Sequence, residues 1–240
     1  MKPKIVGNRL KTYVHGLDEK LGGGIPIGYI VLVSGPSGSM KSSFTYSILY
    51  NSNLEKGTKG LYLSLEQRKD DLVDQMKELG MSIEKTKNFN VVDISKLRKE
   101  LKESESSLDW LNSLVGMADR YKKEIGCDIL AIDSLDALYS LIAFKNPRRE
   151  IYHFFEGLRN LGMNVFLVSE MQRGEQTFGR HGVEEFLSDG IIHLKLKEVE
   201  SGQITSVRRY IGIVKMRKTS HSTDYHPFLV VDGRFELVLK

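Results

Sequence analysis

The sequence predicts an α/β fold, in which a mostly parallel sheet lies between helices and antiparallel strands form its C-terminal edge. Three observations support this prediction. An apolar run, a glycine-rich turn and a helical pattern follow one another between Tyr29 and Phe44. Short apolar runs then alternate with amphipathic stretches as far as residue 170, which is typical of parallel strands joined by helices. The last third consists of long strand-like runs joined by turns. The 240 residues are enough for one such domain over 1–240.

The composition favours a protein of a reducing compartment. The chain has 35 Lys and Arg residues against 31 Asp and Glu residues, and its net charge of +4 permits contact with nucleic acid without indicating it. The single cysteine, Cys127, excludes a disulfide within the chain, and the six histidines lack the spacing of a zinc site. No apolar run is long enough to cross a bilayer, and residues 1–10 lack the apolar core of a signal peptide. We therefore expect a cytoplasmic protein with no membrane segment.

The turn between the first buried strand and the first long helix has the layout of a P-loop. Ile30–Val33 is apolar and β-branched, Gly35–Ser39 is a turn, and Lys41 and Ser42 begin a helical pattern. In a P-loop the backbone N–H groups surround the phosphates of a nucleotide, the lysine neutralises them, and the next hydroxyl binds Mg²⁺. The alternative is a glycine-rich turn without a ligand. The predicted contacts to ATP are Ser37, Gly38, Ser39, Met40, Lys41, Ser42 and Ser43.

Met40 departs from the P-loop pattern, which has glycine before the lysine. A side chain at this position needs room that the usual loop does not leave. The backbone donor is still present, so we expect nucleotide binding to be retained with altered affinity or rate.

The second strand is predicted over 60–67, with Glu66 at its carboxyl end. An open α/β sheet places its ligand at the carboxyl ends of its strands, so Glu66 is a candidate for the base that polarises the attacking water. The alternative is a solvated acid ahead of the next helix. That helix is predicted over 69–79, and a short strand follows over 89–94.

Two helices are predicted between this strand and the next buried one. The charge-dense stretch 95–107 is predicted to be a solvated helix, and 108–125 an amphipathic helix.

A second chemical landmark is the apolar run that begins at Cys127 and ends in Asp133. In P-loop enzymes an acid at this strand end holds the Mg²⁺ shell, so we expect Ser42 and Asp133 to form the metal site. Many buried strands end in Asp, which is the alternative interpretation. Cys127 is expected to pack beside the strand.

Asn146 and Pro147 have the pattern of a helix start, and the helix is expected to run to about Leu161. The strand after it ends in Ser169 and Glu170, which either sense the terminal phosphate or complete the strand with hydrogen bonds.

The segment 171–185 is glycine-rich and too polar for a core. Arg173, Arg180 and His181 near Phe178 are candidates to hold single-stranded nucleic acid through phosphate contacts and stacking. A subunit-contact loop is the interpretation that we favour.

The C-terminal third predicts two hairpins. The first joins 190–199 to 206–218 through a turn at 200–203, and the second turns at Asp232 and Gly233. Alternation along the first hairpin puts Lys215 and Arg217 on one face, with Met216 opposite. Two like charges on one face need an anion, and Glu198 is a candidate within the chain.

Several segments together resemble the KaiC/RadA-like branch of the RecA superfamily. They are GLDEKLGGGIPIG ahead of the P-loop, GVEEFLSDGIIHL, IVKMRKTSH and HPFLVVDG, in the order and spacing of a KaiC domain. The resemblance extends from about His15 to Val238. It implies a RecA-like P-loop NTPase fold. KaiC itself has two such domains and RadA has an additional N-terminal DNA-binding domain, whereas this chain has one domain.

The resemblance also implies a homo-oligomer, a hexameric ring that hydrolyses Mg·ATP. In such rings the Lys-x-Arg pair, here Lys215 and Arg217, reaches the γ-phosphate in the neighbouring subunit's site. Met216, His221 and Asp232 are implied as further contacts at the same interface.

KaiC-like proteins usually carry two adjacent acids where this chain has Glu66 and Gln67. The loss of the second acid, together with Met40, predicts slow turnover. One alternative is an ATP-sensing assembly or regulatory factor similar to the KaiC-like component of the archaellum motor. Another is a recombination accessory protein of the RadA-paralogue type that binds single-stranded DNA. No stretch of the sequence names a protein partner.

Overall fold

The structure is a computed structural model that describes residues 8–93, 107–171, 177–201 and 204–239. Apart from Ser107, the stretch predicted as a solvated helix lies outside the described residues, as does Arg173.

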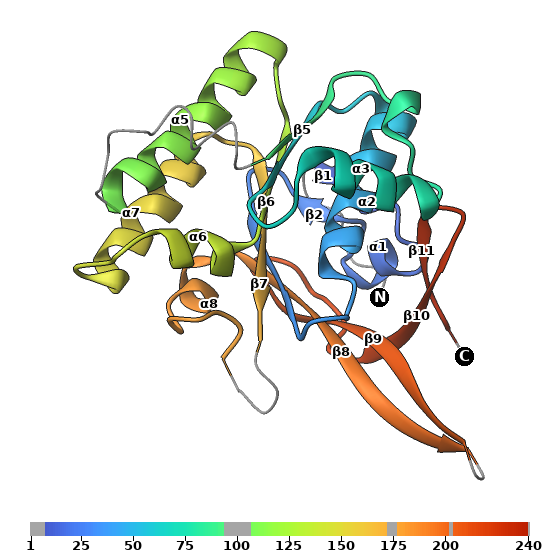
Figure 1. Ribbon diagram of the computed structural model, residues 1–240. Helices are drawn as coiled ribbons and strands as arrows, with labels where there is room; N and C mark the ends of the chain where they lie inside the picture. Colours follow the sequence, from blue (N-terminus) through green and yellow to red (C-terminus); the bar gives the residue numbers. More distant parts are fainter. Residues whose placement is uncertain (1–7, 94–106, 172–176, 202–203, 240) are drawn as a thin grey trace.

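The described helices include seven α-helices, of which α2, α3, α5 and α7 are the longer ones (Figure 1). Their bounds are α1 Leu17–Lys20, α2 Lys41–Lys56, α3 Lys69–Glu78, α5 Ser107–Ile125, α6 Leu135–Leu141, α7 Pro147–Asn160 and α8 Glu184–Leu187, with a 3-10 turn at Ile83–Lys85. The strands are β1 Arg9–Leu10, β2 Ile25–Pro26, β3 Ile30–Gly35, β4 Gly60–Ser64, β5 Phe89–Asp93, β6 Ile129–Asp133, β7 Asn164–Glu170, β8 Gly190–Ser201, β9 Ile204–Met216, β10 Tyr225–Val231 and β11 Arg234–Leu237.

The main sheet, within the described residues, has nine strands in the order β11-β10-β9-β8-β3-β7-β6-β4-β5. The strands from β8 to β5 pair in parallel, whereas β9, β10 and β11 add antiparallel pairs at one edge. This is the predicted α/β architecture, a mostly parallel sheet with antiparallel C-terminal strands. Because β3, β4, β6 and β7 are parallel neighbours, their carboxyl ends meet at one edge of the sheet.

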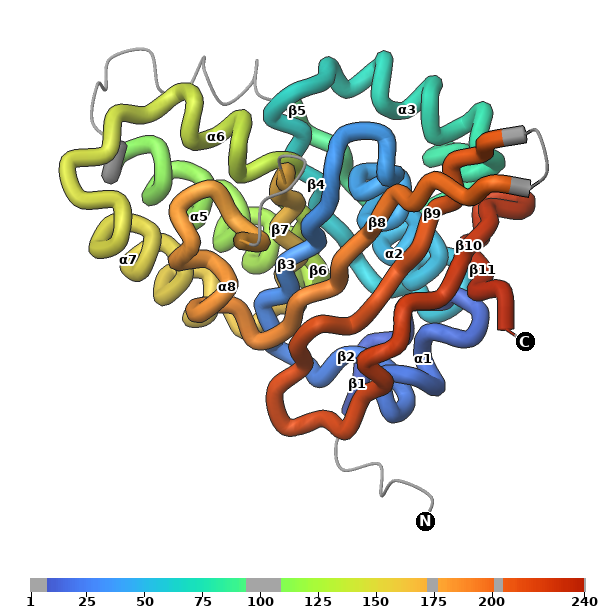
Figure 2. The backbone as a smooth tube through the Cα atoms, turned by 90° about the horizontal axis from the view of Figure 1, so that it is seen from below, coloured from blue at the N-terminus to red at the C-terminus, as the bar shows by residue number. Residues whose placement is uncertain are grey.

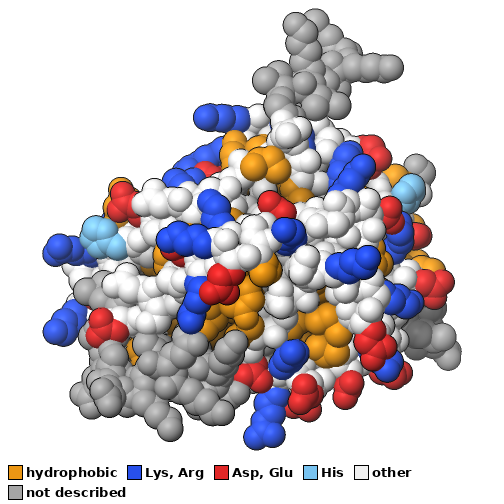
Figure 3. All heavy atoms as spheres, turned by 90° about the horizontal axis from the view of Figure 1, so that it is seen from above, with side chains coloured by type: hydrophobic (Ala, Val, Ile, Leu, Met, Phe, Trp, Pro, Cys, Tyr) orange, Lys and Arg blue, Asp and Glu red, His pale blue; other side chains and the backbone are white. Residues whose placement is uncertain are grey.

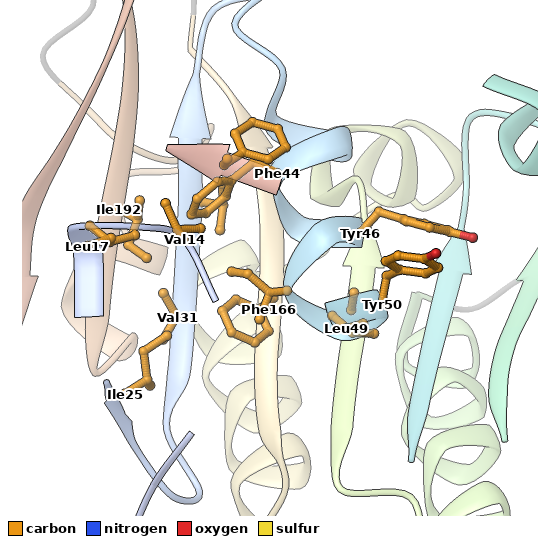
Figure 4. Packing of buried hydrophobic residues seen from close by; sticks show 14 of the residues in the cluster. Val14, Leu17, Ile25, Val31, Phe44, Tyr46, Leu49, Tyr50, Phe166 and Ile192 are labelled. Carbon is orange, nitrogen blue, oxygen red and sulfur yellow. The ribbon is translucent and has the colours of Figure 1, made fainter. Parts of the chain in front are cut away.

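Helices cover both faces of the sheet, and successive side chains of β3 alternate between two hydrophobic cores. Val31 and Val33 join a core with α1, α2, α3 and the last hairpin, part of which is drawn in Figure 4. Ile30 and Leu32 join a second core with α5, α6 and α7 on the other face. In Figure 1 these two helix layers lie on opposite sides of the central strands. A strand that is buried on both faces has a continuous apolar sequence, as β3 does.

The hairpin of β8 and β9 is much longer than the strands beside it. β8 pairs with β3 only between Gly190 and His193, and its remaining residues pair with β9 alone. The hairpin therefore projects beyond the sheet as an arm, which Figures 1 and 2 show.

The sequence located the long elements within a few residues. The helix before Leu161 begins as predicted, since the Asn146 side chain accepts a hydrogen bond from the Arg149 amide and Pro147 occupies the first turn. The prediction for the second strand was wrong at its end, because β4 stops at Ser64 rather than continuing to Glu66. The short elements α1, α6, α8, β1 and β2 were not predicted, because pieces of two to seven residues carry too little periodicity.

None of the described helices combines the length and the apolar character that crossing a membrane requires. Seen from above, the surface intersperses Lys and Arg with Asp and Glu side chains (Figure 3), as the nearly balanced composition predicts.

His193 makes the stability of the fold depend on pH. It lies on β8 beside Ser34 of β3, and its Nδ1 is 2.8 Å from the Tyr225 hydroxyl. Burial lowers the pKa of His193 to about 4, and the positive charge of Lys195 acts in the same direction. Between pH 6.5 and 4 the unfolded chain therefore binds a proton that the folded chain does not, so folding stability falls as the pH falls.

We predict that His193→Gln removes this part of the acid sensitivity. The difference in unfolding free energy between pH 7 and pH 4 should shrink by at most roughly 3 kcal/mol. Urea titrations at several pH values measure it, with His153→Gln, at an exposed histidine, as the matched control. Identical pH profiles for the parent and His193→Gln would contradict the prediction.

Candidate functional site

The turn after β3 is closed by its own hydrogen bonds. The Pro36 carbonyl accepts from the Ser39 amide at 3.2 Å, from the Ser39 hydroxyl at 2.7 Å and from the Lys41 ammonium at 3.1 Å. Gly38 and Met40 both have positive φ, 80° and 71°, and α2 begins at the next residue, Lys41. A turn of this kind ahead of a helix N-terminus is a backbone site for phosphate. The predicted order of strand, turn and helix is confirmed.

The arm packs closely against this turn. A Cβ atom on Gly35 would lie 2.3 Å from the Leu194 carbonyl oxygen, so glycine is required where β8 passes. From β9, Arg209 Nε donates to the Gly38 carbonyl at 3.3 Å. Arg209 could not be singled out from the sequence, because it lies 171 residues from Gly38 along the chain.

Met40 occupies the position where a P-loop has glycine, and it does so in the left-handed conformation. Only glycine adopts that conformation without cost, and other residues lose about 1–2 kcal/mol there. The half-buried Met40 side chain packs against the core on the α2 face, which offsets part of this cost. Its carbonyl accepts the Phe44 amide at 2.9 Å, so the first helical hydrogen bond is intact.

Lys41 lies among four carboxylates, three at or just beyond the ends of β4, β6 and β7 and one on α6. Its Nζ is 3.9 Å from Glu170 Oε1, and the charges of Asp133, Glu66 and Asp136 also act on it. Burial nevertheless lowers the pKa of Lys41, because the side chain is only 7% exposed and the carboxylates compensate incompletely. A buried ammonium beside a phosphate-binding turn is suited to a polyphosphate.

Ser42 and Asp133, the two predicted metal ligands, are close enough for the Ser42 hydroxyl to act on the Asp133 carboxylate. Hydrogen bonds from Tyr62 and Ser42 favour the charged carboxylate, but burial is stronger and raises the pKa of Asp133. The buried Tyr62 hydroxyl donates to Asp133 Oδ2 at 2.5 Å. A hydroxyl and a carboxylate are oxygen ligands that fit Mg²⁺. In the described ranges, no group of three or more His, Cys, Asp or Glu side chains is arranged to hold a metal ion.

Glu66 lies beyond the end of β4 but beside the strand end that carries Asp133. Its Oε1 accepts a hydrogen bond from the Ser134 hydroxyl. Ser134 also caps α6, which fixes its position. The neighbouring Gln67 is exposed, and its Nε2 lies 3.3 Å from Gln75 Oε1. Glu66 thus adjoins the predicted metal site, while Gln67 points to a neighbouring helix.

Lys215 and Arg217 contact a single stretch of their own chain. Lys215 Nζ donates to the carbonyls of Glu185 and Ser188, both at 2.7 Å. Arg217 donates to the Phe186 carbonyl at 2.8 Å. The predicted opposite orientation of Met216 is confirmed, because it is buried in the core on the α2 face.

The acid between these cations is Asp189, and the suggestion of Glu198 was wrong. Glu198 pairs with Val207, far along the arm. Asp189 is buried and lies 3.1 Å from Arg217 and 2.7 Å from Arg159 of α7. The hairpin register places Glu198 eight residues from Lys215 along β9, whereas Asp189 directly precedes β8 and its carbonyl accepts the Arg217 amide.

The Lys-x-Arg pair lies toward the amino end of β3, away from the predicted phosphate-binding turn at its carboxyl end. Lys215 pairs with Ile191, which pairs with Leu32. Three residues of strand, about 10 Å, then separate Leu32 from Gly35. Lys215 and Arg217 therefore do not share the site of Lys41 in the same chain.

Two further predicted contacts, His221 and Asp232, also lie away from Lys41. His221 Nδ1 is 3.1 Å from the Thr219 carbonyl oxygen, in the loop after β9. Asp232 turns between β10 and β11, where Gly233 accepts a hydrogen bond from Asn51 near the end of α2. Asn51 is ten residues beyond the start of α2, or about 15 Å along the helix.

The aromatic groups of the segment 177–185 are engaged within the fold. The Phe178 ring packs edge-on against the His193 ring. The His181 ring packs against two aromatic rings, from α6 and the segment after it. Arg180 is exposed. Phe178 and His181 therefore pack internally instead of presenting free faces to bases.

Sequence reasoning missed Tyr62, Asp136, Asp189 and Arg209. Asp136 follows the Asp133 landmark closely and accepts the Glu170 amide at 2.6 Å, so its place three residues after a candidate metal ligand was a usable signal. In the sequence Tyr62 looks like an ordinary strand residue and Asp189 like an ordinary turn residue. Only the folded structure shows that Tyr62 contacts Asp133 and that Asp189 contacts Arg217.

Comparisons with known proteins agree with this geometry. Residues 10–238 match the family described as "ATPase: KaiC". A UPF0273 protein of Thermotoga maritima is 33% identical over 232 residues, which cover 93% of each chain. A UPF0273 protein of Aeropyrum pernix is also 33% identical, over 94% of this chain and 91% of the relative. The crystal structure of the KaiC-like protein PH0186 from Pyrococcus horikoshii OT3 superposes with a TM-score of 0.81 and 26% identity, over 98% of this chain and 100% of that chain.

We predict that glycine at position 40 is more stabilising than alanine. Met40→Gly and Met40→Ala both lose the packing of the side chain, but only glycine removes the left-handed strain. Met40→Gly should exceed Met40→Ala in unfolding free energy by about 1 kcal/mol, measured by denaturant titration.

Gly116 in the middle of α5 provides the matched control. It has open space around its Cβ position, so alanine should be the more stable residue there by about 1 kcal/mol. The same order of stability at both positions would contradict the interpretation of Met40.

Proposed function

The chain belongs to the KaiC family of ATPases, and on that premise we propose that it binds Mg·ATP and hydrolyses it slowly within a homo-oligomeric ring. The observation that carries the proposal is the contact of Ser42 with Asp133 beside the buried Lys41. In this arrangement Lys41 and the backbone of the turn hold the phosphates. Ser42 and Asp133 hold Mg²⁺, which would neutralise developing charge on the phosphates.

Glu66 is the residue that we propose to align the attacking water. Its link to Ser134 keeps a carboxylate beside Asp133 while the side chain itself stays exposed. A base must be both fixed and accessible to water. Among the other carboxylates around Lys41, Asp133 serves the metal and Asp136 accepts the Glu170 amide. The Glu170 carboxylate is paired with Lys41 itself at 3.9 Å, which leaves Glu66 as the better candidate.

The ring form of the proposal follows from the two ends of β3. Lys215 and Arg217 lie too far from their own Lys41 to act on the same nucleotide, yet they carry positive charge toward an exposed surface. A neighbouring subunit can bring its γ-phosphate to them, as an arginine finger in trans does. By family resemblance we propose a hexamer, with Met216, His221 and Asp232 at the same interface.

A second candidate function is ATP sensing with negligible turnover. Gln67 supports it, because an amide pointing to Gln75 adds no second carboxylate beside Glu66. Met40 supports it as well, since a packed side chain stiffens the turn. ATP binding without measurable phosphate release from an assembled ring would favour this candidate.

We predict that Glu66→Gln and Lys41→Ala separate hydrolysis from binding. Glu66→Gln should keep its affinity for Mg·ATP and lose about 10²- to 10⁴-fold in turnover. Lys41→Ala should lose most of its affinity, because the buried charge that faces the phosphates is removed. Calorimetry and phosphate-release assays measure the two effects. Unchanged turnover by Glu66→Gln would assign Glu66 a structural role, and unchanged binding by a folded Lys41→Ala would move the site elsewhere.

We also predict complementation between subunits. Arg217→Ala and Glu66→Gln should each be nearly inactive alone and regain activity when mixed, because some interfaces then pair an intact Glu66 with an intact Arg217. Arg217→Lys mixed with Glu66→Gln tests whether charge without the guanidinium suffices. Absence of recovery despite demonstrated subunit exchange would exclude action in trans.

A further inference from the structure

Asp189 differs from the other acids near the proposed interface because it is buried and fully engaged. Its Oδ2 accepts from Arg159 at 2.7 Å and from the amide of Ile30 at 3.1 Å, and its Oδ1 accepts from Arg217 at 3.1 Å. Its own carbonyl accepts the Arg217 amide at 2.9 Å. Both the backbone and the side chain of Arg217 are therefore fixed to this one residue.

The guanidinium of Arg217 is held on one side only. One terminal nitrogen donates to Asp189 and the other to the Phe186 carbonyl, yet the side chain is 47% exposed. A guanidinium has five N–H donors. Donors remain for an anion that approaches from solvent, and the held donors fix the plane in which it is bound.

The excess of positive charge around Asp189 favours the binding of such an anion. Three cations, Arg159, Arg217 and Lys215, surround the single buried carboxylate, and the charge of Asp189 raises the pKa of Lys215 against the larger effect of burial. Lys215 itself is bound to two carbonyl oxygens rather than to an acid. The charge of Glu185 also acts on Lys215, and two carboxylates do not neutralise three cations, so the patch is suited to a further negative group.

We propose that Asp189 is a positioning residue for the Lys-x-Arg pair. It holds Arg217 directly, and Lys215 through the adjoining backbone. Both are thereby placed to receive the terminal phosphate of a nucleotide bound to a second copy of this chain. This inference rests on the proposed function in trans. Carboxylates that orient metal-binding side chains contribute about 10- to 100-fold to metal affinity or activity, and we expect an effect of that size for Asp189. Asp189 lies next to Ile30, five residues of strand from Gly35, so it does not touch the nucleotide site of its own chain.

The test is the complementation pattern of Asp189→Asn. This variant keeps the size and one acceptor of the side chain and removes the charge. We expect unchanged ATP affinity and a roughly 10- to 100-fold loss of turnover at saturating Mg·ATP. Mixed with Glu66→Gln, it should recover as much activity as Arg217→Ala does. Mixed with Arg217→Ala, it should recover none, because both defects then lie on the same face of the subunit.

Arg159→Ala is the matched control for stability. It removes the shorter of the two ion pairs to the same carboxylate and leaves Arg217 held by Asp189, so it should lower the unfolding temperature and cost clearly less turnover than Asp189→Asn. If it is as inactive as Asp189→Asn, the network is merely structural and the proposal is overturned. A rise in activity in Asp189→Asn would mean that Asp189 withholds Arg217, which also overturns it. If Asp189→Asn does not fold, Asp189→Glu, which keeps the charge but moves it, should show the same complementation pattern.

The outcomes distinguish the two proposals. Failure of the Arg217→Ala and Glu66→Gln mixture overturns action in trans and this inference with it. Recovery in that mixture without recovery of Asp189→Asn by Glu66→Gln overturns the role of Asp189 alone.

Discussion

The ammonium of Lys41, buried among the carboxylates of three strand ends, is the interaction on which the site depends. Parallel strand pairing brings these groups together. Ser64 of β4 lies opposite Asp133 of β6, and Ser34 of β3 lies opposite Ser169 of β7. Side chains that are far apart in the sequence thus converge at one edge of the sheet. Burial lowers the pKa of Lys41 and raises that of Asp133, so both charged forms are destabilised in the same place. A divalent cation and a polyphosphate would relieve both at once, because each supplies the opposite charge.

Strain and packing compensate each other around the turn. The loop requires a left-handed residue before Lys41, and this chain supplies methionine instead of glycine. The side chain is retained because it packs on the core beside α2, so that the rigidity of the turn comes from side-chain packing as well as from backbone hydrogen bonds. A loop fixed in this way changes shape less readily than one with glycine, whose backbone is freer. Slow turnover is the expected consequence for a reaction that needs the loop to adjust.

The sequence predicted the long elements and the chemistry at their ends, for physical reasons. Buried parallel strands read as continuous apolar runs, and a strand and turn followed by Lys41 and Ser42 are typical of a phosphate-binding loop. The features that could not be predicted from the sequence depend on contacts between distant segments. Glu66 was assigned to a strand because its apolar neighbour, Leu65, extends the pattern past Ser64. Glu198 was chosen as the counter-ion from alternation alone, although the hairpin pairs it with Val207, and Asp189 precedes β8 at the position beside the end of β9.

The two ends of β3 have different chemistry, and this difference bears on assembly. At its carboxyl end the strand leads into the turn proposed to bind phosphate, and at its amino end the Ile30 amide is bound to Asp189, which also holds Arg217. A rigid strand buried on both faces keeps these groups about 16 Å apart, too far for one nucleotide to contact both within a subunit. Closing that distance by bending would disrupt both cores. Head-to-tail contact between copies brings opposite ends together without deforming either. The proposed contact of Arg217 with a phosphate therefore needs a second copy of the chain, as the proposed ring would supply.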